Sequence, residues 1–163
     1  MRALLIALAL CLSIPAAAQR HAVRVNPAAM LLGGTFGLEY EHLVVPHIAI
    51  GAELAYHDSR AQLYNPEPAV DEDGDEVVVR GVFVGLRPTV YTGAGLRGAY
   101  LSPAFGVVPR AVDGNRYLVG GTAGWSWVAG MVNLRLGAGY GCWIIEGAAT
   151  GTLLIDLSVG LAF

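Results

Sequence analysis

The feature that most constrains this chain is a strict two-residue alternation along its last twelve residues, 152–163. Large apolar side chains occupy every second position, and the positions between them are mostly small or polar. Side chains of a β-strand point alternately to its two faces, whereas a helix would scatter the same residues around its axis. The segment therefore predicts a strand with one apolar face, which carries Leu153, Ile155, Leu157, Val159, Leu161 and Phe163.

The same two-faced pattern recurs upstream. Two further segments alternate less cleanly, because Gly98–Val108 contains Pro103 and Ala22–Leu32 contains Pro27. Proline cannot donate to a strand ladder, so we expect the first of these strands to be shortened or bulged. The clear segments are Thr35–Val44, Ile48–Asp58, Val78–Tyr91, Arg116–Val128 and Met131–Tyr140.

The connections between these segments predict their topology. Short turns alternate with longer links, as in membrane barrels that have tight periplasmic turns and longer external loops. An even strand number also requires a strand before Thr35–Val44, which Ala22–Leu32 would supply through a turn at Gly33-Gly34. We therefore predict an all-β, antiparallel up-and-down transmembrane β-barrel of about eight strands. The predicted turns are Pro46-His47, Thr92–Arg97 and Ala129-Gly130, and the predicted long links are Ser59–Val77, Pro109–Asn115 and Gly141–Gly151.

The distribution of polarity indicates which face of the strands meets lipid. Hydrophobic residues make up 55% of the chain, yet after the N-terminal segment no run reaches the roughly 18 apolar residues of a membrane helix. A soluble barrel would place its apolar face inside and its charged face in water. Here the less apolar faces carry Gly, Ala, Ser and Thr with about one charge per strand, which suits the interior of a narrow barrel.

The inward registers bring together a set of charged residues with three positive and four negative members. Charges buried inside a barrel need partners, since an unpaired one costs several kcal/mol. We therefore predict a structural plug of ion pairs, with a pore lining as the alternative interpretation. The set comprises Arg24, Glu39, Glu41, Glu53, Arg87, Arg135 and Asp156.

The N-terminus has the order of a secretory signal peptide. A basic start is followed by an apolar run at 4–14 and by small residues up to Ala18, and this order is typical of an exported precursor. We expect residues 1–18 to be the signal peptide and residues 19–163 to form the barrel. Cys142 would then be the single cysteine of the mature chain, which excludes an internal disulfide. A net charge of −3 gives no electrostatic basis for binding nucleic acid.

The final strand, Leu154–Phe163, resembles the C-terminal sorting signal of outer-membrane proteins, and the overall plan resembles small OmpA/OmpX-like barrels. Val25-Asn26-Pro27 and the segment 37–41 are similar to a poorly characterised family of such barrels. The resemblance implies a bacterial outer-membrane location, with lipid and lipopolysaccharide around the barrel and the barrel-assembly machinery as a partner during insertion. We expect a monomer. The residues matching the assembly signal are Leu157, Val159, Leu161 and Phe163.

Three classes of function are compatible with such a barrel. The first is a structural or surface-interaction role carried by the external loops, and the second is a narrow channel or small-ligand carrier. The third is a lipid-modifying enzyme, for which His57, Asp58 and Ser59 would be candidates. Alternation sends His57 and Asp58 to opposite faces, so we expect no enzyme and no cofactor. The acidic segment 71–76 lacks EF-hand spacing, which leaves a solvated loop or, as the alternative, cation bridging to lipopolysaccharide.

Overall fold

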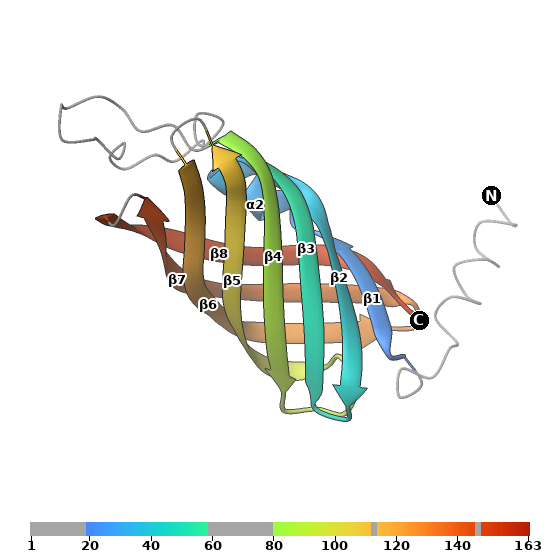
Figure 1. Cartoon of the computed structure of the whole chain (residues 1–163). Coiled ribbons are helices and arrows are strands. Elements are labelled where there is room, and N and C mark those ends of the chain that lie inside the picture. The colour runs from blue at the N-terminus through green and yellow to red at the C-terminus, as the bar shows by residue number, and fades with distance from the viewer. Residues whose placement is uncertain (1–18, 59–79, 112–113, 146–147) are drawn as a thin grey trace, which may run out of the picture.

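The computed structural model describes residues 19–58, 80–111, 114–145 and 148–163. Its strands form a closed antiparallel barrel in which each strand pairs with the next and β8 pairs with β1 (Figure 1). The prediction of an all-β, up-and-down barrel of about eight strands is confirmed. The elements are β1 (His21–Val25), α2 (Pro27–Gly33), β2 (Thr35–Val45), β3 (Ile48–Asp58), β4 (Arg80–Tyr91), β5 (Gly98–Ala111), β6 (Gly114–Ala129), β7 (Val132–Ile145) and β8 (Ala148–Ala162).

The two ends of the barrel differ. At the turn end, the backbone N–H of His21 donates to the carbonyl of Phe163 at 2.9 Å, and the connections at 46–47, 92–97 and 130–131 lie here. These connections confirm the predicted short turns, the last of them displaced by one residue. The opposite end, toward which α2 lies (Figure 1), is called the α2 end below. The predicted signal peptide, the link Ser59–Val77 and the acidic segment 71–76 lie outside the described residues.

Two predicted long links at the α2 end are wrong. Strands β5 and β6 extend until only residues 112–113 separate them, and β7 and β8 until only 146–147 do. The physical reason is that several inward positions near this end are apolar and buried, namely Val108, Leu118 and Trp143. At these positions the alternation of polar inward and apolar outward residues is lost, although the strands continue.

The predicted strand Ala22–Leu32 is also only partly right. Strand β1 ends at Val25, and the helix α2 follows it. Pro27 is favourable at the first position of a helix, where its missing N–H is not needed. The Asn26 side chain caps the helix by accepting from the backbone N–H of Ala29 at 3.0 Å, as capping residues do. Gly34 ends the helix with a left-handed φ of 61°, so the predicted Gly33-Gly34 turn is instead a helix and its C-cap.

Asn26 also extends the short β1 along its neighbour β8. Its side-chain amide donates to the carbonyl of Ile155 at 2.9 Å. Its side-chain oxygen accepts from the backbone N–H of Leu157 at 3.3 Å. The Asn26 side chain thus takes the place of a strand backbone where β1 has ended, and it forms hydrogen bonds with backbone groups of β8 beyond the last β1 pair.

Strand β5 continues through Pro103 and keeps its register with β6 there, so the expected shortening or bulge is wrong. The pairing of β4 with β5 is nevertheless interrupted between the pairs Leu86–Phe105 and Val90–Leu101. Pro88 and Pro103 both lie in this gap, where neither can donate a ladder hydrogen bond. The hydroxyl of Thr89 bridges the gap from inside by donating to Ser102 Oγ at 3.0 Å.

The outward face of the barrel is apolar along its length, and large hydrophobic side chains are exposed on every strand. No helix of the described residues is long and apolar enough to cross a membrane. Six tyrosine and tryptophan side chains are exposed on this surface: Tyr40, Tyr56, Tyr117, Trp125, Trp127 and Tyr140.

Replacing Asn26 tests its double role. We expect Asn26→Ala to lower the free energy of unfolding by about 2–3 kcal/mol, because a helix cap and two hydrogen bonds to β8 are lost. Urea unfolding of the refolded barrel, followed by tryptophan fluorescence, measures this change. Asn26→Asp is the matched control: its carboxylate keeps the acceptor but loses the donor to Ile155, so a smaller loss is expected. An Ala variant as stable as the parent would contradict the assignment.

Candidate functional site

Glu39 lies at the centre of the barrel, where three strands bring arginines to it. It accepts from Arg24 at 3.0 Å, from Arg87 at 3.2 Å and from Arg135 at 3.1 Å. Arg24 is 1% exposed and Arg135 is fully buried. Hydrogen-bonded ion pairs of this kind offset the desolvation cost of burying charges in a narrow interior. The predicted plug of ion pairs therefore forms around one carboxylate.

Glu41 is the second acidic member of the plug. It pairs with Arg24, and its Oε2 lies 3.8 Å from an Arg135 nitrogen. The hydroxyl of Tyr91 donates to both oxygens of Glu41, at 3.0 and 2.8 Å. Arg24 also donates to Asn133 Oδ1 at 2.5 Å. Every carboxylate oxygen on this side of the plug therefore has a donor.

Asp156 is the third acidic member. It pairs with Arg135 at 2.9 Å and with Arg87 at 3.2 Å. It also accepts from the hydroxyls of Tyr100, at 2.8 Å, and Ser158. The Arg135 guanidinium lies over the Tyr100 ring, 4.1 Å from its centre, which is a cation–π geometry. Three arginines and three carboxylates are thus matched.

The tyrosine, amide and hydroxyl members of the plug were not predicted. The sequence does contain a signal that could have identified them, because they lie at inward-facing positions of the same strands as the predicted charges. Tyr91 lies four residues after Arg87 on β4, and Asn133 lies two residues before Arg135 on β7. Arg116 is a further inward, buried residue that the prediction missed. The remaining unpredicted partners are Tyr100, Thr122, Ser126 and Ser158.

The turn end of the interior is filled by side chains. Tyr91 and Tyr100 lie 6.2 Å apart between ring centres, and Leu43 and Leu96 pack in the same cluster. Leu96 belongs to the 92–97 connection, and its backbone carbonyl accepts a hydrogen bond from Ser126 Oγ at 2.6 Å. This connection therefore folds back into the barrel and closes it below the plug.

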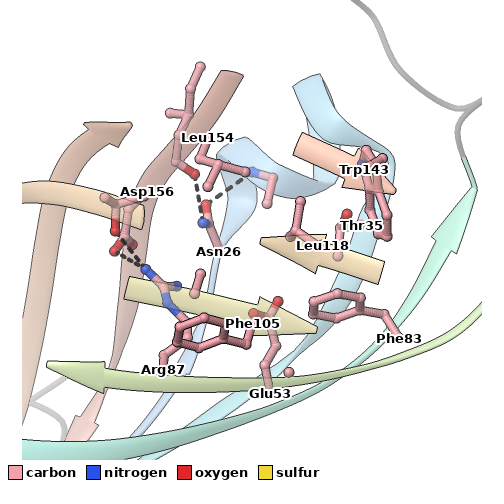
Figure 2. Close-up of a pocket in the computed structure, with 15 residues that line it drawn as sticks. Asn26, Thr35, Glu53, Phe83, Arg87, Phe105, Leu118, Trp143, Leu154 and Asp156 are labelled. Carbon is pink, nitrogen blue, oxygen red and sulfur yellow. Dashed lines mark hydrogen bonds and ion pairs between the residues drawn. The ribbon is translucent and has the colours of Figure 1, made fainter. Parts of the chain in front are cut away.

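A cavity of about 90 Å³ lies on the other side of the plug, toward the α2 end (Figure 2). Its walls are largely apolar and include Phe83, Leu118 and Trp143 of the strands and Ala29 of α2. The Phe83 and Trp143 rings meet edge to face, with centres 6.1 Å apart. Arg87 and Asp156 of the plug form its polar floor. On this volume scale a water needs about 10–15 Å³, so the cavity holds roughly six to nine waters.

Glu53 does not belong to the plug, and its predicted place in the ion-pair network is wrong. It faces the interior, but among the described residues it has no hydrogen bond or ion pair. Its strand position explains this, since Glu53 pairs in register with Gly85, two residues nearer the α2 end than Arg87. Its carboxylate therefore points into the cavity beside Phe83 (Figure 2).

His57 and Asp58 lie on opposite faces of β3, as their positions in sequence predict. His57 is buried, shares a 2.8 Å hydrogen bond with Thr35 Oγ1, and packs on Trp143 with ring centres 5.0 Å apart. Asp58 pairs with Arg80 at 2.7 Å. The two side chains therefore do not form an acid–base pair with each other, and Ser59 lies outside the described residues.

The four residues that match the assembly signal face outward along β8 and just beyond it. The Phe163 ring stacks on His21, 5.5 Å between centres. His21 in turn lies 2.7 Å from the Tyr40 hydroxyl and 3.3 Å from His42. The signal residues Leu157, Val159, Leu161 and Phe163 are all exposed.

Comparisons with known proteins give this chain no relatives. No family model, no curated protein and no solved structure matches it. An eight-stranded barrel does not by itself identify a family, so the resemblance to OmpA/OmpX-like barrels remains an expectation. Within the part of the chain that the structure describes, no three His, Cys, Asp or Glu side chains gather where they could hold a metal ion.

The same Glu→Gln substitution should have a large effect on stability in the plug and a small one in the cavity. We expect Glu39→Gln to lower the free energy of unfolding by about 3–5 kcal/mol, because three buried arginines lose their common partner. Glu53→Gln removes a carboxylate that has no ion pair, so we expect a change within about 1 kcal/mol. Urea unfolding of both variants side by side measures the difference. Equal losses would contradict the separation of Glu53 from the plug.

Proposed function

We propose that this chain is a bacterial outer-membrane barrel with a non-conducting interior and a structural or surface-interaction role. One observation carries the proposal: polarity is inverted, with arginines and carboxylates buried inside and large apolar side chains exposed outside. Monomeric soluble proteins rarely expose contiguous apolar patches larger than a few hundred Å². A barrel surrounded by lipid requires such a surface, since its apolar side chains then contact hydrocarbon.

The positions of the exposed charges support a lipid-facing band. Among the described residues, the exposed charged side chains are Arg20, Arg80 and Arg97. Arg20 and Arg97 lie at the turn end, and Arg80 begins β4 at the α2 end. A charged side chain in mid-bilayer costs several kcal/mol, whereas near the headgroups it costs little. Exposed charges at the two ends, with apolar side chains between them, are what we expect of a barrel whose wall crosses a membrane.

Outward aromatic residues gather toward both ends of the barrel. Phe36 and Tyr56 are register partners near the α2 end. Trp125 and Trp127 lie near the turn end, with ring centres 6.4 Å apart. Tyr and Trp favour the membrane interface, where the ring is half buried and the polar atom stays hydrated. Two such belts support the proposed spanning orientation.

The filled interior favours a structural role over a channel. An ion in transit would have to pass the plug around Glu39 and then the apolar cluster at the turn end. Narrow eight-stranded barrels are filled by their own side chains. The parts left for contact with a partner are the segments at the α2 end, which the proposed orientation places outside the cell.

The expected partners follow from this placement. Lipid and lipopolysaccharide would surround the barrel wall, and the barrel-assembly machinery would recognise the last strand during insertion. We propose export through a signal peptide at residues 1–18 and a monomeric barrel as the mature form. The proposed kinship is with OmpA/OmpX-like barrels, and the proposal assigns no catalytic activity.

Membrane fractionation combined with a heat-modifiability gel tests the proposed location. We expect the expressed chain in the outer-membrane fraction, with folded and boiled samples migrating differently, because a closed barrel resists detergent until heated. Planar-bilayer recording of the purified barrel should show no steady single-channel steps. A chain that is soluble in the periplasm would overturn the location, and steady conductance would overturn the filled interior.

Replacing the terminal residue tests the proposed assembly signal. We expect Phe163→Ser to reduce the folded amount in the outer membrane several-fold, because recognition of the last strand would lose its aromatic end. Phe36→Ser is the matched control, since Phe36 is 43% exposed and Phe163 is 53% exposed on the same outward face. Quantified gels of folded and unfolded forms measure both variants. Equal effects would assign Phe163 to lipid contact alone.

A further inference from the structure

The charges of the plug balance one another, and a further inward carboxylate lies outside the plug, in the cavity. The three arginines of the plug are matched by Glu39, Glu41 and Asp156. Glu53 is the carboxylate left over, and the described residues give it no hydrogen bond or ion pair. An uncompensated carboxylate in apolar surroundings is costly. A cation that binds beside Glu53 would remove that cost.

The cavity walls select the kind of cation. Arg87 also lines the cavity, but its terminal nitrogens are engaged by Glu39, Asp156 and Thr122. The charged lining therefore sums to one negative charge, from Arg87, Glu53 and Asp156. Divalent metals such as calcium take six or more oxygen ligands, which these largely apolar walls do not provide. An anion would be repelled.

Aromatic rings lie beside the Glu53 side chain. A Cβ at Gly85 would lie 2.8 Å from the Phe83 ring and 3.3 Å from Glu53 Cβ, so the two side chains are neighbours across this glycine. Trp143 of β7 meets the Phe83 ring of β4 edge to face across the interior. An organic ammonium ion is attracted to aromatic faces, and its methyl groups can pack on Leu118.

We propose that this cavity binds a small organic ammonium compound. Its cationic group would lie beside Glu53, and its apolar part would lie against Phe83 and Trp143 (Figure 2). The cavity volume of about 90 Å³ suits a molecule with the bulk of a small amine. The inference goes beyond the proposed structural role, and it does not depend on the membrane location.

Titration with choline tests this site on the full mature barrel. The protein is refolded in an uncharged detergent, because a cationic or zwitterionic one would compete. Calorimetry then compares choline chloride with its uncharged analogue, in which carbon replaces the ammonium nitrogen. We expect saturable binding of choline. The uncharged analogue should bind at least about tenfold more weakly, and a tenfold ratio corresponds to about 1.4 kcal/mol. No binding of choline, or equal binding of both compounds, would overturn the proposal.

Variants locate the site within the molecule. We expect Glu53→Gln to weaken choline binding about tenfold and Phe83→Leu to weaken it about fivefold, because the carboxylate and the aromatic face contribute separately. Asp58→Asn is the matched control: it removes a carboxylate near the same end, outside the cavity, and should bind as the parent does. Unchanged binding by Glu53→Gln would overturn the assignment. A gel of folded and boiled samples verifies that each variant has folded.

Fluorescence gives a readout that needs no change inside the cavity. Trp125 and Trp127 face outward, so replacing both with Phe leaves Trp143 as the remaining tryptophan. Choline should shift or quench the emission of Trp143 with the same concentration dependence as the heat signal. Binding heat without any change in this emission would place the ligand elsewhere and overturn the proposed site.

Discussion

The ion pairs that converge on Glu39 are the interaction on which the rest of this barrel depends. They link side chains of β1, β2, β4 and β7, and Asp156 adds β8. A slip of one residue in any of these strands would turn its charged group outward and leave its partners unpaired inside. The network therefore couples strand register to charge compensation, so the correct register is the one in which every plug charge has a partner.

Alternation in the sequence was sufficient to predict the closed barrel and the inward position of the seven charged residues. It could not predict how those residues divide, because register between strands decides that Glu39 meets three arginines while Glu53 meets none. Nor could it predict where β7 ends, since the inward Trp143 breaks the polar pattern. The helix α2 was missed because parity favoured a strand, although Asn26-Pro27 is a sound helix start.

The interior is asymmetric along its axis, and glycine positions contribute to this. A Cβ at Gly106 would lie 2.2 Å from two carbons of the Phe83 ring, so only glycine leaves room for that ring. On the turn side of the plug, the hydroxyls of Tyr91 and Tyr100 donate directly to the carboxylates of Glu41 and Asp156. The interior thus has packed side chains at the turn end and a cavity at the α2 end.

The brevity of β1 has a mechanical consequence for the wall. Strands β7 and β8 share fourteen register pairs, whereas β1 and β8 share four, extended by the side chain of Asn26. Local opening takes place where the fewest hydrogen bonds must break. We therefore expect the seam between β1 and β8 to be the part of the barrel wall that opens first under mechanical or thermal stress.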